Sequence, residues 1–357
     1  MSASSSVAVL ALNPGSSSLK AVLRDDETVL LRAQVQRLGT DRAQLTVDDE
    51  PAADPGQSLT DAVGTLATEL AHRHRTVDVV VHRVVHGGPD HRDPERVDDA
   101  LVGVLRELVP FAPLHLPGDL ESIAAARLEW PHAVHVACFD TQFHADLPDE
   151  ARRLPVPREV VELGVQRYGF HGLSVQHVVD TVADLGRAVV AHLGSGCSVT
   201  AVDGGRSLHT SMSFSPTGGT VSATRAGDLD PEVLLFLIEQ GWSVPELRTL
   251  VDRRSGLAGV SGGTSDVRDL LDHRGDDPAA DLALRMFVRS VAQSVAAAAA
   301  VLDGWDTLVF TGGVGEHSAE IRDAVLTRLA HLGEPRVEVV ATDEEAVMDR
   351  LARTLTT

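Results

Sequence analysis

Short apolar runs that stop at polar or glycine-containing turns recur along the chain. Val7–Leu12 is such a run, and after a polar turn Leu19–Arg24 is apolar again, which predicts two strands joined by a turn. Val77–Val85 is a valine-rich run typical of a buried strand, whereas Gln57–Arg73 carries apolar residues at helical spacing. Strand-like and helix-like segments that alternate in this way predict an α/β protein.

A second pair of apolar runs joined by a glycine turn lies in Ala188–Val202 and is similar to the opening pair. Two such pairs predict an internal duplication, with one copy in each of two domains. A chain of 357 residues is long enough for two domains. We therefore expect two interwound α/β lobes with a cleft between them. Composition shows no single domain boundary, and the loop-rich Pro148–Pro157 is the only obvious seam.

Two later segments carry more local predictions. Thr307–Phe310 predicts a strand, Thr311–Glu316 a glycine loop, and a helix is expected from about Ser318. A glycine loop between a strand and a helix suits the phosphates or the sugar of a nucleotide. Earlier in the chain, Ser174 is predicted to be the N-cap of a helix.

The formal net charge of −21 argues against nucleic acid and against anionic membrane surfaces as partners. The two cysteines, Cys138 and Cys197, lack CxxC or CxxH spacing, so we expect reduced structural thiols in the cytoplasm. Residues 1–6 contain no basic region, and Val7–Leu12 is too short for a signal sequence. The most apolar helix, near Ala279–Leu302, carries charged side chains, so we expect it to be buried or at an interface rather than to span a membrane.

The opening turn, Asn13–Lys20, holds the only lysine and the only asparagine of the chain. All other cationic side chains are arginines, whose planar guanidinium does not replace a compact ammonium at a tight site. The glycine and serines of this turn offer backbone N–H groups and hydroxyls to a phosphate-sized anion. A strand, and not a helix, is expected after it, so it is not a Walker loop. The alternative is a polar β-turn with an isolated lysine.

Several basic side chains fall in loops or at the ends of predicted strands, although the chain as a whole is acidic. They are Lys20, Arg83, His115, His171, His192 and Arg225. This pattern predicts a pocket for strongly anionic ligands, which we interpret as a nucleoside triphosphate and an anionic second substrate. Phosphoryl transfer between them needs in-line positioning and charge neutralisation more than covalent help from the protein.

Three of these interpretations have structural alternatives. Arg83 could pair with a surface carboxylate, and Arg225 could pair with an aspartate of its own loop. Asp140, which follows the predicted strand His135–Phe139, could bind a metal, orient a base or cap the next helix.

Six motifs, in this order along the chain, resemble those of the acetate kinase family. They are Asn-x-Gly-Ser-Ser-Ser-Leu-Lys at 13–20, His-Arg-Val-Val-His-Gly-Gly at 82–88, Ala-Pro-Leu-His at 112–115, Phe-Asp-Thr-x-Phe-His at 139–144, Arg-x-Gly-Phe-His-Gly at 167–172 and Thr-Arg-x-Gly-Asp-x-Asp-Pro at 224–231. The motifs span nearly the whole chain, and six in register are far more specific than any one of them.

The resemblance implies the fold of acetate and sugar kinases, heat-shock ATPases and actin. That fold has two duplicated actin-like (ribonuclease H-like) α/β domains with a nucleotide cleft between them. Here they would be an N-terminal acyl-kinase lobe, residues 1–142 with 344–357, and a C-terminal nucleotide-binding lobe, residues 143–343. The resemblance also implies reversible phosphoryl transfer from ATP to acetate, giving acetyl phosphate and ADP. Mg²⁺, or alternatively Mn²⁺, would be the metal, and the enzyme would be a cytoplasmic homodimer.

The resemblance further implies a role for each matching residue. The metal-site residues are Asn13 and Glu344. The residues at the reacting phosphoryl group are Asp140, His171 and Arg225. The residues that bind the carboxylate substrate are Arg83, Val85, Leu114, His115, Phe170 and Pro216. The residues that bind the nucleotide are Lys20, His192, Leu193, Gly194, Ser195, Gly196, Asp266, Val267, Arg268, Gly313, Val314, Gly315, Glu316 and His317.

Elementary chemistry refines two of these roles. A carboxylate substrate is ionised at neutral pH, because its reference pKa is about 4. No general base is required, so we predict that Asp140 orients Arg83 or the water shell of the metal. Val85 leaves little room for an extra methyl group, which predicts acetate over propionate. A propionate or butyrate kinase, and a catalytically weak nucleotide-binding protein of the same fold, are the alternatives.

Some positions depart from the family's pattern. Ser195 and His317 replace asparagines of two nucleotide-binding segments, and Leu-Pro-Gly follows His115 where the family usually has Asn-Pro. These differences bear on nucleotide affinity and on the preferred base more than on the chemistry.

Overall fold

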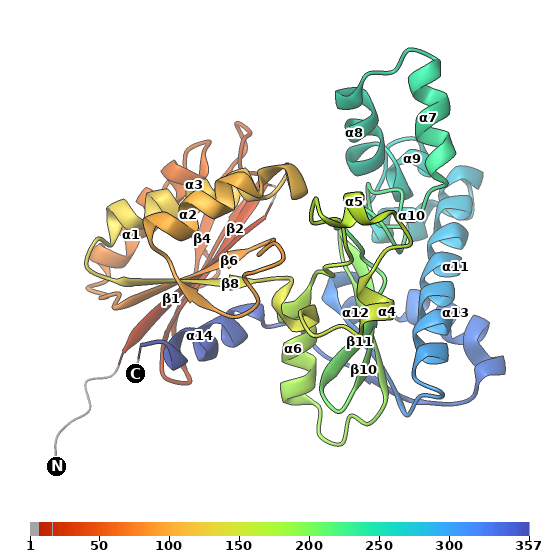
Figure 1. Ribbon diagram of the computed structural model, residues 1–357. Helices are drawn as coiled ribbons and strands as arrows, with labels where there is room; N and C mark the ends of the chain where they lie inside the picture. Colours follow the sequence, from red (N-terminus) through yellow and green to blue (C-terminus); the bar gives the residue numbers. More distant parts are fainter. Residues whose placement is uncertain (1–6, 16, 357) are drawn as a thin grey trace. The chain divides into compact units, whose positions relative to one another are not determined.

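The structure is a computed structural model that describes residues 7–15 and 17–356. It divides into two compact units. One runs to Gln142 and resumes at Asp343, and the other is Phe143–Thr342. Each unit is an α/β domain built on its own sheet (Figure 1).

The first unit contains an eight-stranded sheet in the order β5-β4-β3-β2-β1-β6-β8-β7. Its strands are β1 Ala8–Gly15, β2 Ser18–Asp25, β3 Thr28–Gln36, β4 Gln44–Val47, β5 Glu50–Pro51, β6 Val79–Val84, β7 Glu95–Arg96 and β8 Val134–Phe139. Its helices are α1 Leu59–His72, α2 Asp99–Glu107, a 3₁₀ turn at Val109–Phe111, α3 Leu116–Glu129 and α14 Glu344–Thr354. Helices α1, α2 and α3 lie on one face of the sheet, and α14 lies on the other (Figure 1).

The second unit contains a five-stranded sheet in the order β11-β10-β9-β12-β13. Its strands are β9 Ala188–Leu193, β10 Cys197–Asp203, β11 Arg206–Thr210, β12 Thr307–Thr311 and β13 Arg336–Val339. Its α-helices are α4 Asp149–Arg152, α5 Arg158–Val161, α6 Gly172–Thr181, α7 Pro231–Glu239, α8 Val244–Arg253, α9 Gly256–Ser261, α10 Val267–His273, α11 Pro278–Val301, α12 Gly312–His317 and α13 Ala319–Leu329. Short 3₁₀ turns lie at Gln142–His144 and Ala330–Leu332.

The two sheets share a core with the same strand order and the same strand directions. In the first unit β3, β2 and β1 are antiparallel, and β6 and then β8 continue the sheet parallel to β1. In the second unit β11, β10 and β9 are antiparallel, and β12 and then β13 continue parallel to β9. The predicted α/β fold and the predicted duplication are therefore confirmed.

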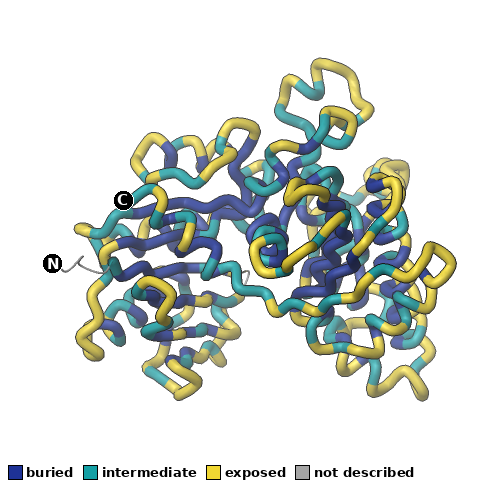
Figure 2. Tube along the Cα trace, turned by 90° about the horizontal axis from the view of Figure 1, so that it is seen from below, coloured by how far each residue is buried: buried dark blue, intermediate teal, exposed yellow. Residues whose placement is uncertain are grey.

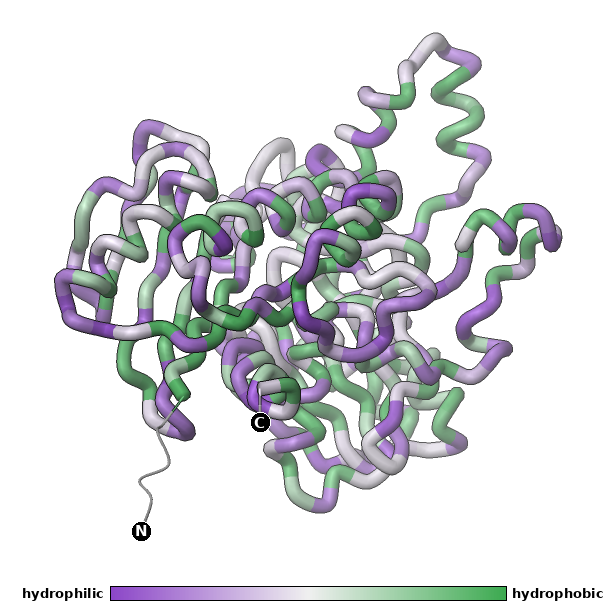
Figure 3. The backbone as a smooth tube through the Cα atoms, turned by 60° about the vertical axis from the view of Figure 1, so that its left-hand side comes forward, coloured by the Kyte–Doolittle hydropathy of each residue, from purple (hydrophilic) through white to green (hydrophobic). Residues whose placement is uncertain are grey.

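Strands β1, β6, β8, β9 and β12 are almost wholly buried, whereas loops and the outer sides of helices are exposed (Figure 2). Helices cover both faces of these strands, and for that reason their sequences read as continuous apolar runs instead of alternating ones. Along the chain, hydrophobic stretches alternate with hydrophilic connections (Figure 3). The sheet edges where buried strands end are therefore the places where polar side chains gather.

Helix α11 is 24 residues long and has the length and apolar composition of a helix that could cross a membrane. However, its side chains Ala283, Phe287, Val291 and Val295 belong to the same hydrophobic core as strands β9 and β10. This packing agrees with the predicted buried or interface helix.

The prediction of a glycine loop at Thr311–Glu316 is wrong. Helix α12 begins at Gly312, directly after β12. Gly312 has a φ of +75°, and a Cβ atom there would lie 2.9 Å from the carbonyl oxygen of Leu193. Glycine therefore makes the turn from strand to helix in a single residue, which a side chain would prevent.

The predicted N-cap at Ser174 is also wrong. Helix α6 begins at Gly172, and its N-cap residue His171 has a left-handed backbone with φ of +58°. Ser174 lies inside the first turn and is completely buried. Its hydroxyl is therefore available for a tertiary contact instead of capping the helix.

His144 is a buried histidine that supports the segment before α6. Its Nε2 lies 3.1 Å from the carbonyl oxygen of Phe170, and its Nδ1 lies 2.9 Å from the hydroxyl of Ser207. Because a carbonyl oxygen only accepts, Nε2 carries the proton and Nδ1 accepts from Ser207. Burial lowers the pKa of His144 to about 4.

We predict that His144 makes stability fall in mildly acidic solution. The unfolded chain binds a proton near pH 6.5 and the folded chain only near pH 4, so stability is lost as the pH falls through this window. His144→Gln should therefore reduce the fall in the free energy of unfolding between pH 6.5 and pH 4 by up to about 3 kcal/mol, which corresponds to the difference between the two pKa values. Urea unfolding at several pH values measures this difference.

The matched control is His331→Gln, an exposed histidine of the same unit, which should leave the pH dependence unchanged. An equally steep loss of stability in His144→Gln and in the unmodified protein would contradict the assignment.

Candidate active site

The first unit brings Arg83 and Asp140 together at the carboxyl ends of β6 and β8. These strands are parallel neighbours, and the backbone N–H of Asp140 donates to the carbonyl of Val84 at 2.9 Å. The side chains form an ion pair in which Asp140 is 2% and Arg83 13% exposed. The carboxylate that pairs with Arg83 is therefore buried and not on the surface, and the pair orients both side chains.

Two atoms of this ion pair remain unpartnered among the described residues. They are Oδ1 of Asp140 and Nε of Arg83, and both are buried. Buried polar atoms in folded proteins nearly always have a hydrogen-bond partner, and an exception at a sheet edge points to a ligand.

Asn13 and Glu344 also meet in this unit, although they are 331 residues apart. The side-chain amide of Asn13, on β1, donates to Glu344 at 2.9 Å and to Glu345 at 2.8 Å, at the start of α14. Burial, and then the charges of Asp140 and Glu345, raise the pKa of Glu344. Negative charge is therefore concentrated here beyond what the nearby protein groups neutralise.

This donor set fits a magnesium ion. Mg²⁺ prefers oxygen ligands and is usually held by one or two carboxylates together with waters and substrate phosphates. Asn13 and Glu344 supply an amide and a carboxylate of that kind. Within residues 7–15 and 17–356, no group of three or more His, Cys, Asp or Glu side chains is arranged to hold a metal by itself.

Asp119, on α3, is a site residue that sequence reasoning missed. It is 3% exposed, and its Oδ2 accepts a hydrogen bond from the backbone N–H of Val85 at 2.8 Å. Burial raises the pKa of Asp119 to about 7, while the charge of Arg83 acts in the opposite direction. Asp119 lies one helical turn after His115, and this spacing was the available signal.

Arg83 is consequently surrounded by carboxylates. Burial alone would lower its pKa, but Asp140, Asp119 and Glu344 outweigh burial and raise it. The guanidinium is therefore a fixed cation with several anionic neighbours, and its orientation is set by those neighbours.

The substrate residues predicted in the first unit lie around this cluster. Leu114, His115 and Asp119 line a cavity of about 330 Å³ together with Pro14 and Gly15 of the opening turn. Val85 does not line this cavity; it is 1% exposed.

Lys20 lies next to the predicted metal residue. It is exposed on β2, directly opposite Asn13 in the β1–β2 register, so the two side chains share one face of the sheet. Ser16 of the same turn lies outside the described residues.

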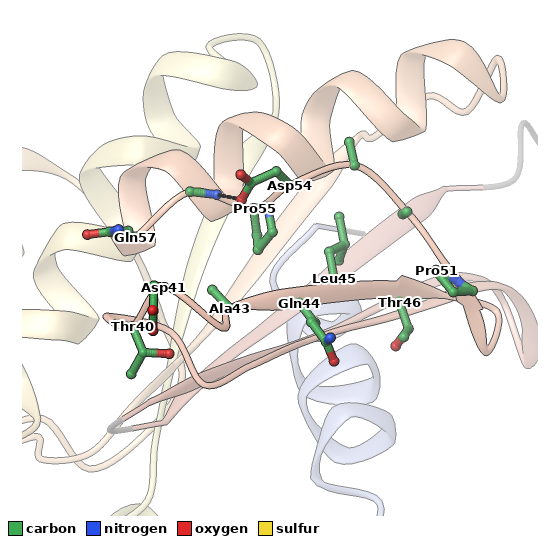
Figure 4. Close-up of a pocket in the computed structure, with 13 residues that line it drawn as sticks. Thr40, Asp41, Ala43, Gln44, Leu45, Thr46, Pro51, Asp54, Pro55 and Gln57 are labelled. Atoms are coloured by element: carbon green, nitrogen blue, oxygen red, sulfur yellow. Dashed lines mark hydrogen bonds between the residues drawn. The ribbon is translucent and has the colours of Figure 1, made fainter.

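Another cavity of the first unit, of about 400 Å³, is lined by β4, β5 and the loop that precedes α1 (Figure 4). In that loop the backbone N–H of Gly56 donates to Asp54 at 2.9 Å. None of the predicted site residues lines this cavity, so it is separate from the candidate site.

The second unit brings the three predicted nucleotide-binding segments together around one cavity of about 800 Å³. The predicted residues that line it are Gly194, Ser195, Asp266, Val267, Arg268, Gly313, Val314 and His317. The others do not line it: His192, Leu193, Gly196, Gly315 and Glu316. Glu316 instead accepts a hydrogen bond from the backbone N–H of Thr342 at 3.0 Å.

His171 and His192 form a stacked pair in the second unit, with ring centroids 4.1 Å apart. Nδ1 of His171 lies 3.0 Å from the hydroxyl of Ser198, and Nδ1 of His192 lies 2.8 Å from the hydroxyl of Ser174. Each ring is thus held by one hydroxyl and by its stacking neighbour.

Arg225 and His171 both lie close to Gly196. A Cβ atom placed on this glycine would come 2.9 Å from Nη1 of Arg225 and 3.4 Å from the ring of His171. Arg225 also donates to the carbonyl of Pro216 at 3.1 Å. Phe170 is 1% exposed and contributes its carbonyl to His144. The predicted catalytic and acyl-pocket residues of this unit are therefore neighbours.

The chain matches the sequence profile of the Acetokinase family over residues 8–350. It is 41% identical to an acetate kinase from Deinococcus deserti over 343 residues, covering 91% of this chain and 86% of that protein. The crystal structure of a propionate kinase from Francisella tularensis superposes with a TM-score of 0.92 at 29% identity, covering 98% of this chain and 99% of that one.

The crystal structure of an acetate kinase from Porphyromonas gingivalis superposes with a TM-score of 0.85 at 31% identity, covering 98% of this chain and all of that one (100%). The profile match, the sequence identity and the two superpositions agree over nearly the full length of the chain, and the fold class expected from the sequence is confirmed. This protein therefore belongs to the acetokinase family.

Proposed function

We propose that this protein is an acetate kinase, which reversibly transfers the γ-phosphoryl group of ATP to acetate and forms acetyl phosphate and ADP. The observation that carries the proposal is the buried Arg83–Asp140 pair, with its unpartnered Nε and Oδ1 atoms at the sheet edge. A fixed guanidinium with a spare donor suits the carboxylate of a small acid. Membership of the family and the acetate kinase relatives support the same reaction.

Asp140 serves as an orienter in this proposal. Acetate is ionised at neutral pH, since carboxylic acids have reference pKa values of about 4, and it needs no base to become a nucleophile. The ion pair holds Asp140 on Arg83, and Arg83 in turn binds the carboxylate and aims one oxygen at phosphorus.

The second unit would supply the groups that bind the nucleotide and the transferring phosphoryl group. The cavity of about 800 Å³ with its glycine-containing walls suits a nucleotide. His171 and Arg225, which both lie close to Gly196, would donate to the equatorial oxygens of the transferring phosphoryl group. Lys20, in the first unit, would contact the phosphates.

Asn13 and Glu344 would hold the divalent ion, Mg²⁺ or alternatively Mn²⁺. The amide and carboxylate oxygens and the raised pKa of Glu344 support this assignment, because a cation would relieve the surplus negative charge. When bound, the ion neutralises charge on the phosphates.

We further infer a cytoplasmic homodimer that binds neither nucleic acid nor membranes. The net charge of −21 and the free, buried thiols Cys138 and Cys197 support this inference. Helix α7 exposes Leu235, Phe236 and Ile238, and subunit interfaces bury surfaces of this kind.

A propionate kinase is the second candidate function, because the propionate kinase from Francisella tularensis superposes closely on this chain. Val85 favours acetate. Its side chain is buried and its backbone is held by Asp119, so the predicted acyl pocket cannot easily widen at this position.

The reaction can be tested directly by trapping acyl phosphate as the hydroxamate, with ATP, Mg²⁺ and acetate. We expect acetyl hydroxamate from the unmodified protein. Arg225→Gln should lower kcat by roughly 10³–10⁵, because a cation at the transferring phosphoryl group is lost. Arg248→Gln, an exposed arginine of the same unit, is the matched control and should retain full activity. Absence of acyl phosphate with every short acid would favour a nucleotide-binding protein without kinase activity.

Substrate choice gives a separate prediction. One methylene group is worth about 1–3 kcal/mol in a small apolar pocket, so kcat/KM for propionate should be roughly 10–200-fold lower than for acetate. Val85→Ala should narrow this difference, since it removes the methyl groups that would meet the longer chain. A preference for propionate in the unmodified protein would refute the acetate assignment and leave the carboxylate kinase assignment intact.

A further inference from the structure

We propose that Ser174, oriented by Thr342, is a positioning residue that holds His192 with its ring proton on Nε2, so that His192 donates a hydrogen bond to a phosphoryl oxygen. The inference rests on the proposed phosphotransferase function. It assigns a role to a serine that no motif or comparison singles out.

The contact between Ser174 and His192 is buried. Ser174 is completely buried inside α6, and His192, at the end of β9, is 9% exposed. The hydroxyl oxygen lies 2.8 Å from Nδ1. Water is thus largely kept from this side of the imidazole ring, and the serine decides which protonation state that nitrogen takes.

Thr342 sets the direction of this hydrogen bond. Its hydroxyl donates to the hydroxyl oxygen of Ser174 at 3.2 Å, and its own backbone N–H is tied to Glu316 at 3.0 Å. With its oxygen accepting from Thr342, Ser174 directs its proton to Nδ1 of His192. A neutral imidazole that accepts at Nδ1 carries its proton at Nε2.

Nε2 of His192 lies close to Gly194 and Gly312. A Cβ atom would lie 3.0 Å from Nε2 if placed on Gly312 and 3.5 Å from it if placed on Gly194. Both positions are glycines, so no Cβ atom crowds Nε2 from these two positions. Thr311, opposite His192 in the β9–β12 register, has a buried hydroxyl without a partner among the described residues, which points to a ligand.

The stacked ring of His171 makes the orientation of His192 matter for the reaction. The centroids are 4.1 Å apart, so a rotated His192 would disturb His171 as well. The opposite tautomer would turn a lone pair at Nε2 toward the phosphoryl oxygens and repel them, whereas an N–H group aimed at developing negative charge stabilises it.

The test compares Ser174→Ala with the unmodified protein. Alanine keeps nearly the same volume, so the helix should fold, but His192 loses the donor at Nδ1. We expect kcat to fall by roughly 10–100-fold, the usual effect of removing a group that orients an active-site histidine, with KM for acetate unchanged. Ser122→Ala is the matched control, since Ser122 is also a buried helical serine and its hydroxyl has no partner among the described residues.

A spectroscopic measurement separates positioning from mere stability and from the reaction itself. In ¹⁵N–¹H spectra of histidine-labelled protein, with His192→Gln to assign the signal, His192 should show the Nε2–H tautomer. Ser174→Ala should show a mixture of the Nε2–H and Nδ1–H tautomers of His192. Thr342→Val, which removes the donor that orients Ser174, should give a smaller change in the same direction.

An unchanged tautomer together with unchanged kcat in Ser174→Ala would overturn the proposal. The spectra require no turnover. Failure to form acyl phosphate would therefore contradict the proposed function alone, and the tautomer of His192 would still decide whether Ser174 positions this histidine.

Discussion

The ion pair between Arg83 and Asp140 is the interaction on which the candidate site of the first unit depends. Burying either charge alone costs several kcal/mol, and removing one partner of a buried pair typically costs about 3–5 kcal/mol. The two residues therefore fix the ends of β6 and β8 relative to each other. Asp119 and Glu344 add negative charge around the guanidinium, and Asp119 also holds the backbone of Val85. The same contacts that stabilise the sheet edge thus shape the predicted acyl pocket.

The candidate site residues of the second unit follow a different principle, because they are mainly hydrogen-bond donors and glycines. A Cβ atom on Gly312 would meet the backbone carbonyl oxygen of Leu193 at 2.9 Å, and one on Gly196 would meet the end of the Arg225 side chain at 2.9 Å. His171 and His192 each lie against a hydroxyl, and Arg225 donates to the carbonyl of Pro216. In our proposal the residues of the first unit bind the metal and the carboxylate substrate, and those of the second unit bind the phosphates.

The sequence predicted much of the fold because buried strands leave a strong signal. Both hairpins and the duplication follow from apolar runs and glycine turns, whereas the nucleotide-binding segments were assigned from the resemblance to the family. Asp119 was not predicted, since an acidic residue on a helix ordinarily faces water, and only the tertiary fold shows its contact with Val85. Ser174 was taken for an N-cap for a similar reason: a serine near a helix start usually caps it, whereas here Gly172 begins the helix. The meeting of Asn13 with Glu344 joins the two ends of the chain, and no local pattern could reveal it.

The two departures in the nucleotide-binding segments, Ser195 and His317, both line the cavity of about 800 Å³. They change the polar groups that a nucleotide would meet there, while Arg83, Asp140, His171 and Arg225 match the family's motifs. The proposed catalytic residues thus match the family's motifs, whereas two residues of the proposed nucleotide cavity differ from them.

In the proposed reaction the carboxylate substrate attacks the γ-phosphorus of ATP directly. Asp140, the carboxylate nearest to the substrate guanidinium, is engaged with Arg83 and is not assigned as a phosphoryl carrier. The most direct test uses ATP made chiral at the γ-phosphorus with oxygen isotopes and determines the configuration of the acetyl phosphate. A single in-line displacement predicts inversion. Retention would mean two displacements through a phosphorylated enzyme and would contradict direct attack by the carboxylate substrate.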